Sequence, residues 1–184
     1  MSTLHPLPHT GMSVPDTSVR VSCIDDLTLS SGNIAFRAEV QAAGLPLGTF
    51  HDDGRGGATV FAPRSPKAAL IMQFFVALSR DRNGDPLLEE TVYDHLVEEF
   101  EIGEMVAQAT EEGRYAVRSH TPGHIPQLHS FSLANDHSYP DHEGARTAVT
   151  SEPQTFGPDT VRLELWTGTG WTEVLSHEQD TDTH

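Results

Sequence analysis

The period of the apolar pattern changes once along this chain, and this change limits the fold more than any other feature. From Ser18 to His51 apolar and polar residues alternate, as at Val19, Val21 and Cys23, and a period of two is typical of a half-buried strand. Beyond position 64 the apolar residues recur at spacings of one, three and four, which is typical of a helix packed on a core. Strands followed by helices predict an α+β fold.

Three strands are expected in the first third of the chain. The alternating runs lie at 18–23, 34–41 and 46–51, and turn-forming residues separate them at 30–33 and 43–44. Short turns between alternating runs predict neighbouring antiparallel strands. The sequence therefore predicts an antiparallel meander sheet.

Two helices are expected after the meander, and both begin with a capping residue followed by proline. Ser65 precedes Pro66, and Asp85 precedes Pro86. The first helix is expected to reach about Arg80, and its core-facing stripe comprises Leu70, Ile71, Phe74, Phe75 and Leu78. The second is expected to run to about Glu112 and to bury Val92, Leu96, Val97, Phe100, Met105 and Val106.

The remaining residues complete the expected organisation. Further strands are expected near 115–118 and 128–133, and a C-terminal β-hairpin near 161–175. The fold expected is thus α+β, an antiparallel meander with two helices packed on one face and a C-terminal hairpin. It forms a single domain over 17–175, with a long loop at 134–160, a flexible segment at 1–16 and a disordered tail at 176–184.

The charge of the chain restricts its partners. The formal net charge is -16, from 27 acidic and 11 basic residues. Such an excess repels phosphate backbones and anionic lipids, so no nucleic-acid or membrane partner is predicted. The only cysteine, Cys23, has no internal disulfide partner, and we expect it to be a core thiol. Without an apolar span or secretory signal, the sequence predicts a cytoplasmic location.

The segment HDDGRGGATVFAPRSPK at 51–67 is the first candidate site. It leads from an expected strand to a helix N-terminus, where glycine-rich backbone can bind an anion. The predicted ligand- or partner-binding residues are Asp53, Gly54, Arg55, Gly56, Gly57, Arg64 and Lys67. The spacing matches neither a P-loop nor a Rossmann motif, and a plain turn capped by Asp52 or Asp53 explains the same residues.

This segment also carries a resemblance. The run NIAFRAEVQAAGLPLGTFHDDGRGGATVFAP, followed by a helix pair, resembles a group of small bacterial and phage proteins with an N-D-G-[RHQ]-G-G loop between a strand pair and helices. Asp53, Gly54, Arg55, Gly56 and Gly57 match that pattern, whereas Asp52 stands where it has Asn. The resemblance covers about residues 19–118 and implies no activity, because none is assigned to the group.

Histidines form the second candidate site. Five of them lie in the region of the expected loop, together with Asp136 and Asp141, namely His120, His124, His129, His137 and His142. Imidazole and carboxylate are ligands for zinc or nickel, but the spacing matches no established motif. No cofactor is predicted, and a divalent metal at these histidines stays an alternative to a solvated polar loop.

The second expected helix is strongly acidic. Nine acids and no Lys or Arg lie between 87 and 113, and the acids are Glu89, Glu90, Asp94, Glu98, Glu99, Glu101, Glu104, Glu111 and Glu112. Either this is a solvated helix face or it attracts a basic partner.

No nucleophile, kinase or P-loop signature occurs in the sequence, which argues against an enzyme. We therefore expect a non-catalytic binding or interaction protein. Its recognition surface would lie at the GRGG loop and the start of the first helix, and its partner would be a small anion or a protein. Two alternatives stay open. One is an enzyme acting on a phosphorylated small molecule, with metal assistance from the histidines, and the other is an acidic decoy for a basic protein.

Overall fold

The computed structural model describes residues 3–122, 126–134 and 139–176. Its contacts divide the chain into two compact units, Met1–Glu101 and Ile102–His184, where the sequence had suggested a single domain. Each unit has its own buried hydrophobic cluster. In the described ranges no helix is long and apolar enough to cross a membrane.

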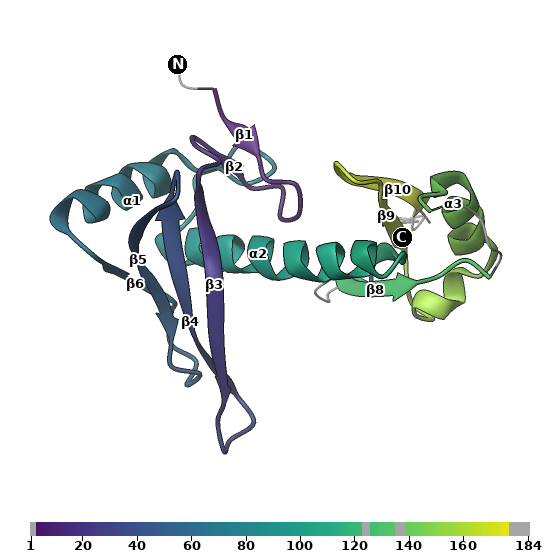
Figure 1. Cartoon of the computed structure of the whole chain (residues 1–184), viewed down its shortest axis with the longest axis horizontal. Coiled ribbons are helices and arrows are strands. Elements are labelled where there is room, and N and C mark those ends of the chain that lie inside the picture. The colour runs from purple at the N-terminus through teal and green to yellow at the C-terminus, as the bar shows by residue number, and fades with distance from the viewer. Residues whose placement is uncertain (1–2, 123–125, 135–138, 177–184) are drawn as a thin grey trace, which may run out of the picture. The chain divides into compact units, whose positions relative to one another are not determined.

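The first unit is built on a four-stranded antiparallel sheet (Figure 1). Its strands are β3 (Val19–Thr28), β4 (Ile34–Ala42), β5 (Leu45–Asp52) and β6 (Val60–Pro63), and they neighbour one another in that order. The expected meander is confirmed and gains β6 as a fourth strand. Alternation places Ala38, Val40 and Phe50 on the buried face, where their exposure is 1% or less.

One residue of the meander departs from the simple alternation. Val21 pairs with Val40, but a β-bulge follows, so that Cys23 pairs with Glu39. A bulge inserts one extra residue and moves the next side chains to the opposite face of the sheet. Cys23 is therefore exposed, and the expected core thiol is wrong.

Two helices complete the hydrophobic cluster of the first unit, α1 (Pro66–Leu78) and α2 (Glu89–Glu111). Ser65 caps α1 as expected, because its hydroxyl accepts the backbone N–H of Ala68 at 3.2 Å. The second helix begins later than expected, since Pro86 forms a β-bridge with Arg80 instead of opening a helix. From α2 the cluster takes Val92, Tyr93, Leu96 and Val97.

The N-terminal segment is part of the fold rather than a flexible lead-in. It forms a small hairpin of β1 (His5–Pro6) and β2 (Ser13–Val14), and it buries Met12 and Val14 to 1% exposure or less. The carboxylate of Glu99 accepts the backbone N–H groups of His9 and Thr10 and the hydroxyl of Thr10, at 2.7 to 3.1 Å. These charge-assisted bonds fix the segment on α2.

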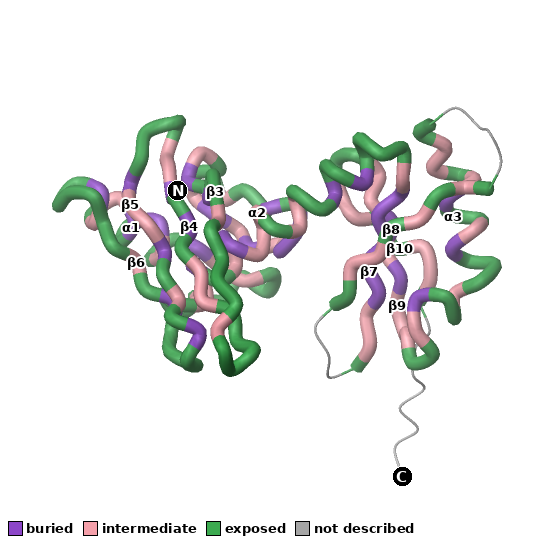
Figure 2. The backbone as a smooth tube through the Cα atoms, turned by 60° about the horizontal axis from the view of Figure 1, so that its bottom comes forward, coloured by how far each residue is buried: buried purple, intermediate pink, exposed green. Residues whose placement is uncertain are grey.

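The second unit has its own antiparallel sheet. Its strands are β7 (Tyr115–His120), β8 (Gln127–Phe131), β9 (Arg162–Trp166) and β10 (Trp171–Ser176), and their order in the sheet is β10-β9-β7-β8. The expected C-terminal hairpin is confirmed as β9 and β10. Figure 2 shows purple, buried backbone at β7 and β9, the two inner strands of this sheet.

A helix lies where a long loop was expected. The helix α3 (His142–Ser151) and the short 3-10 helix η1 (Pro153–Phe156) both fall within 134–160. The carboxylate of Asp141 caps α3 by accepting the N–H of Gly144 at 2.9 Å. Ala145, Val149 and Phe156 pack into the cluster of the second unit. The tail at 177–184 lies outside the described residues.

Candidate functional site

Helix α1 carries apolar side chains on its outer surface. Leu70 is 55% exposed, Phe74 69% and Leu78 39%. These residues follow one another at a spacing of four and therefore share one face of the helix. We call Leu70, Phe74 and Leu78 the α1 stripe. The sequence had suggested that they face the core, and that expectation is wrong.

The core face of α1 is a different set of residues. Ala68, Met72 and Phe75 are buried to 4% exposure or less, and Ile71 and Val76 pack against the same cluster. Among its 13 residues only Lys67 and Gln73 are polar, so the helix is apolar around most of its circumference. A helix of this kind is normally covered on all sides. In α1 the fold of the first unit covers one side only.

Basic residues lie at the N-terminal end of the α1 stripe. Lys67 is exposed in the first turn of α1, Arg64 is exposed just before it, and the helix contains no acidic residue. In the part of the chain that the structure describes, the side chains of Arg55, Arg64 and Lys67 make no hydrogen bond or ion pair. Their charges are therefore available to a partner.

The GRGG loop is closed by its own carboxylates. Asp52 accepts the N–H of Gly54 at 2.7 Å, and Asp53 accepts the N–H of Arg55 at 3.0 Å. Asn33 donates its side-chain amide to the carbonyl of Gly54 at 2.8 Å. Two backbone N–H groups that an anion would need, those of Gly54 and Arg55, are thus already hydrogen-bonded. Of the two interpretations, an anion site or a capped turn, this geometry favours the capped turn. The ligand site at Asp53, Gly54, Arg55, Gly56 and Gly57 stays a prediction.

Gly54 has a specific reason to be glycine. Its φ is +67°, and a Cβ atom at this position would lie 2.8 Å from the carbonyl oxygen of Ile34. Gly56 also has a positive φ, +82°, but space around it is open. Gly54 is therefore a packing requirement of the turn, whereas Arg55 and Gly56 are exposed at its tip.

The described histidines do not converge on one site. His120 ends β7, His129 lies in β8 and His142 begins α3, while His124 and His137 lie outside the described residues. Within 3–122, 126–134 and 139–176 no group of three or more His, Cys, Asp or Glu is placed to hold a metal ion. His129 instead meets the hydroxyl of Ser119 at 2.9 Å.

A paired charge cluster lies across β7 and β9. Glu164 accepts from the Nε and a terminal nitrogen of Arg118, both at 2.7 Å, and meets the Nε2 of His120 at 2.8 Å. The side chains of Arg118 and Glu164 are only 8% and 12% exposed. The guanidinium of Arg118 also lies 4.6 Å from the ring centre of Trp171, and a nitrogen of Arg162 lies 3.1 Å from the Nδ1 of His120.

The pKa values follow from this pairing. Burial raises the pKa of the Glu164 carboxyl, but the His120 hydrogen bond and the Arg118 charge outweigh burial and leave it below its ordinary value. Burial lowers the pKa of His120, and the neighbouring arginines add to this effect against the opposing influence of Glu164. The four residues thus form a hydrogen-bonded charge cluster within the sheet, which is consistent with a structural role.

Sequence reasoning missed this cluster, although a signal was present. Arg118 and His120 are two positions apart on one expected strand, and Arg162 and Glu164 are two apart on another. Such spacing puts each pair on one face of its strand. The cluster forms only because β7 pairs with β9, which places Arg118 opposite Glu164. The sequence spacing alone does not reveal this pairing.

Several acids of α2 serve the fold. Glu99 holds the N-terminal hairpin, Asp94 accepts the hydroxyl of Thr59 at 2.6 Å, and Glu89 accepts the hydroxyl of Tyr93. The charge of α2 is therefore only partly available to a basic partner. The acidic decoy remains an untested alternative.

Comparison with protein-family models, with curated proteins and with solved structures found no match to this chain. The resemblance of the loop to the N-D-G-[RHQ]-G-G group therefore stays a prediction.

Proposed function

We propose that the chain is a non-catalytic interaction protein that binds a partner protein through the α1 stripe and the basic residues at its N-terminal end. The observation that carries the proposal is the exposure of Phe74, at 69%, in the middle of a helix whose other side is buried. The proposal retains the helix start as the recognition surface. It makes the exposed face of α1, rather than the GRGG loop, the main contact surface. It also assumes that the interaction takes place in the cytoplasm.

The energetics favour an apolar contact. Burying one large apolar side chain contributes about 1.5–3 kcal/mol, so three of them on one helix face give a substantial driving force. An aromatic residue between two leucines at a spacing of four is the arrangement with which a helix packs against another apolar surface. Phe74 would be the energetic centre of the contact.

The charge indicates the kind of partner. Arg64 and Lys67 are exposed cations beside the stripe, whereas the whole chain carries a net charge of -16. A partner with an apolar helix flanked by acids would match the stripe and both cations. A second copy of the chain is a less suitable partner, since two chains that each carry a net charge of -16 repel each other. The partner is therefore an amphipathic acidic helix of another protein.

A photo-crosslinking experiment tests the proposal. A benzoylphenylalanine placed at position 74 should crosslink one partner in native extract, whereas the same residue at position 27 should not. Leu27 is a matched control because it is also exposed, at 65%, and lies in β3 of the same unit. The captured protein is identified, purified and titrated with the wild-type chain.

The titration uses variants of the surface. The double variant Leu70→Ser/Phe74→Ser should weaken binding at least tenfold, which is about 1.4 kcal/mol, while its unfolding midpoint stays the same. Lys67→Glu should weaken binding most at low salt. Equal affinity of wild type and double variant would refute the proposal. A wild-type homodimer that the double variant dissociates would assign the stripe to a second copy instead.

A further inference from the structure

The two edges of the second sheet are protected to different degrees. The strand order places β10 at one edge and β8 at the other. The β10 edge has a bulge between Glu173 and Leu175, and the carbonyl of Glu173 accepts from Arg146 at 3.3 Å. Bulges and charges are the usual means by which an edge strand avoids further pairing.

The β8 edge has no bulge and shares with β10 only an arginine contact to one carbonyl. Its sequence QLHSF contains no Lys, Arg, Asp, Glu or Pro, and its pairing with β7 is regular over all five residues. Every second residue of such an edge points its N–H and C=O away from the sheet. Within the described residues no backbone hydrogen bond outside the ladder with β7 reaches β8. The carbonyl of Ser130 accepts from Arg114 at 3.1 Å and keeps a second lone pair.

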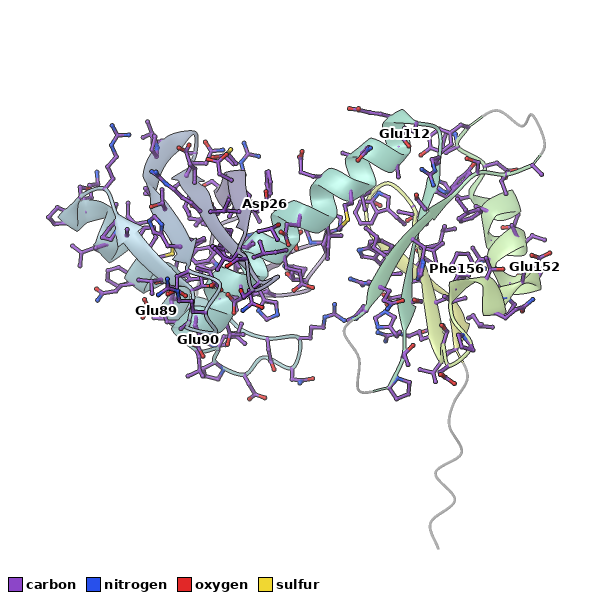
Figure 3. All side chains as sticks on the ribbon, turned by 90° about the horizontal axis from the view of Figure 1, so that it is seen from below. Asp26, Glu89, Glu90, Glu112, Glu152 and Phe156 are labelled. Atoms are coloured by element: carbon purple, nitrogen blue, oxygen red, sulfur yellow. The ribbon has the colours of Figure 1, made fainter. Side chains whose placement is uncertain are left out.

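A groove runs along this edge. It has a volume of about 430 Å³, and its near wall is the continuous stretch 129–134. The far wall comes from α3 and η1 and includes Ala148, Glu152, Thr155 and Phe156. The ring of Phe156 lies 6.0 Å from that of Phe131 and 5.6 Å from that of His129, which forms an aromatic base. Figure 3 labels Phe156 and Glu152 in this helical segment.

We propose that this groove binds an extended peptide segment of a partner, which adds to the sheet as a strand beside β8. The open strand edge supplies main-chain partners, and a groove between a strand edge and a helix accepts alternate side chains, as in other cases of strand addition. This site lies in the second unit and goes beyond the helix-binding function proposed for α1.

The lining defines the chemistry of the peptide. Phe131, Leu133, Ala148 and Phe156 make an apolar place for one bulky aliphatic or aromatic side chain. Glu152 is exposed at the same groove and favours a Lys or Arg in the peptide. Because side chains two positions apart share one face of a strand, the basic residue should stand two positions from the apolar one.

A peptide selection tests the proposal. A phage-displayed library of random dodecapeptides is selected in parallel on the wild-type chain and on Thr155→Trp, which fills the groove from an exposed position. Peptides with an apolar residue and a basic residue two positions apart should be enriched on the wild type alone. The matched control is Gln154→Trp, an exposed neighbour outside the groove lining, which should select the same peptides as the wild type.

The selected peptide then reports the binding mode. N-methylation of every second peptide amide should weaken binding at least tenfold in one register and little in the other, because only one set of amides faces β8. Glu152→Gln should weaken binding several-fold, whereas Glu143→Gln, an exposed acid of α3 outside the groove lining, should not.

Three outcomes would overturn strand addition. The library yields no peptide specific for the open groove, both N-methyl registers bind alike, or the selected peptides bind as helices. A chain that dimerises through this edge, and becomes monomeric in Thr155→Trp, would likewise replace a foreign peptide with a second copy.

Discussion

The two units differ in which side chains depart from the usual rule that apolar residues are buried and charged residues are exposed. The first unit leaves large apolar side chains on its surface, with Phe74 at 69% exposure. The second unit buries charged ones, with the Arg118 side chain at 8%. Burial of Arg118 is explained within the fold, because Glu164 and Trp171 contact it. Exposure of Phe74 has no such explanation within its own unit, which supports the partner-binding surface proposed there.

The first test of this contrast compares a buried and an exposed phenylalanine of α1. Phe75→Ala should lower the free energy of unfolding by about 3–5 kcal/mol, because it removes a core side chain that is 3% exposed. Phe74→Ser, one residue away, should change it by no more than about 0.5 kcal/mol. Urea denaturation of the full chain measures both. Similar losses for the two variants would mean that the α1 stripe is covered within the chain.

The corresponding test in the second unit removes the buried carboxylate of Glu164. Glu164→Gln removes the carboxylate that faces Arg118 and should cost about 3 kcal/mol, since a buried partner charge remains. Glu143→Gln, at an exposed position of α3, is the control and should be nearly neutral. If both variants unfold at the same urea concentration, the cluster across β7 and β9 contributes little to the second unit.

The GRGG loop between β5 and β6 allows two glycines to be compared. Gly54→Ala should cost about 1–3 kcal/mol, because the residue has φ +67° and its Cβ would meet the Ile34 carbonyl. Gly56→Ala has φ +82° but open space, and about 1 kcal/mol is expected. Thermal unfolding of the two variants gives the difference. A larger loss at Gly56 would contradict the packing assigned to the turn.

A pH titration tests the second unit in another way. The folded-state pKa values of His120 and Glu164 both lie below their ordinary values, so the unfolded chain binds more protons at intermediate pH. Stability should therefore fall as the pH is lowered, first below about 6.5, where unfolded histidine titrates, and further below about 4.5 for the glutamate. His120→Gln should flatten the upper part of this decrease. Stability that rises on acidification would contradict the pKa directions.

The smallest effect on folding is expected at the tip of the loop. Arg55 is exposed, and its side chain makes no hydrogen bond or ion pair with the described residues, so Arg55→Ala should leave the melting temperature nearly unchanged. A loss of binding to an anion or to the α1 partner would then identify Arg55 as a contact of the recognition surface. A large drop in melting temperature would instead make this arginine part of the turn.

Much of the fold could be predicted because local patterns specify it. The alternation at 34–41 gave β4, and the Ser65 cap gave the start of α1. The bulge after Val21 could not be predicted, because a single extra residue leaves the pattern of apolar letters almost intact. Helix α3 was missed because its buried face is short, with Ala145 and Val149 as its buried residues.

The candidate sites were harder to predict for two physical reasons. In α1 nearly every position is apolar, so periodicity cannot tell which face the sheet covers and which face stays exposed. In the second unit the Arg118 cluster depends on the pairing of strands about 45 residues apart, which no local pattern encodes. The segment at 51–67 was expected to run from a strand directly into a helix, and this is wrong, because β6 lies between them and pairs with β5. The GRGG loop therefore connects two strands, and its recognition role remains a prediction.

The bonds of Glu99 to His9 and Thr10 have a consequence for synthesis. The β1–β2 hairpin leaves the ribosome before α2, and its hydrogen-bond acceptor is encoded 89 or 90 positions later. Contacts this distant in sequence form late and slow the completion of a domain. Until α2 has been translated, Met12 and Val14 lack part of the cluster that buries them, so this hairpin reaches its final place only after the strands that follow it have been made.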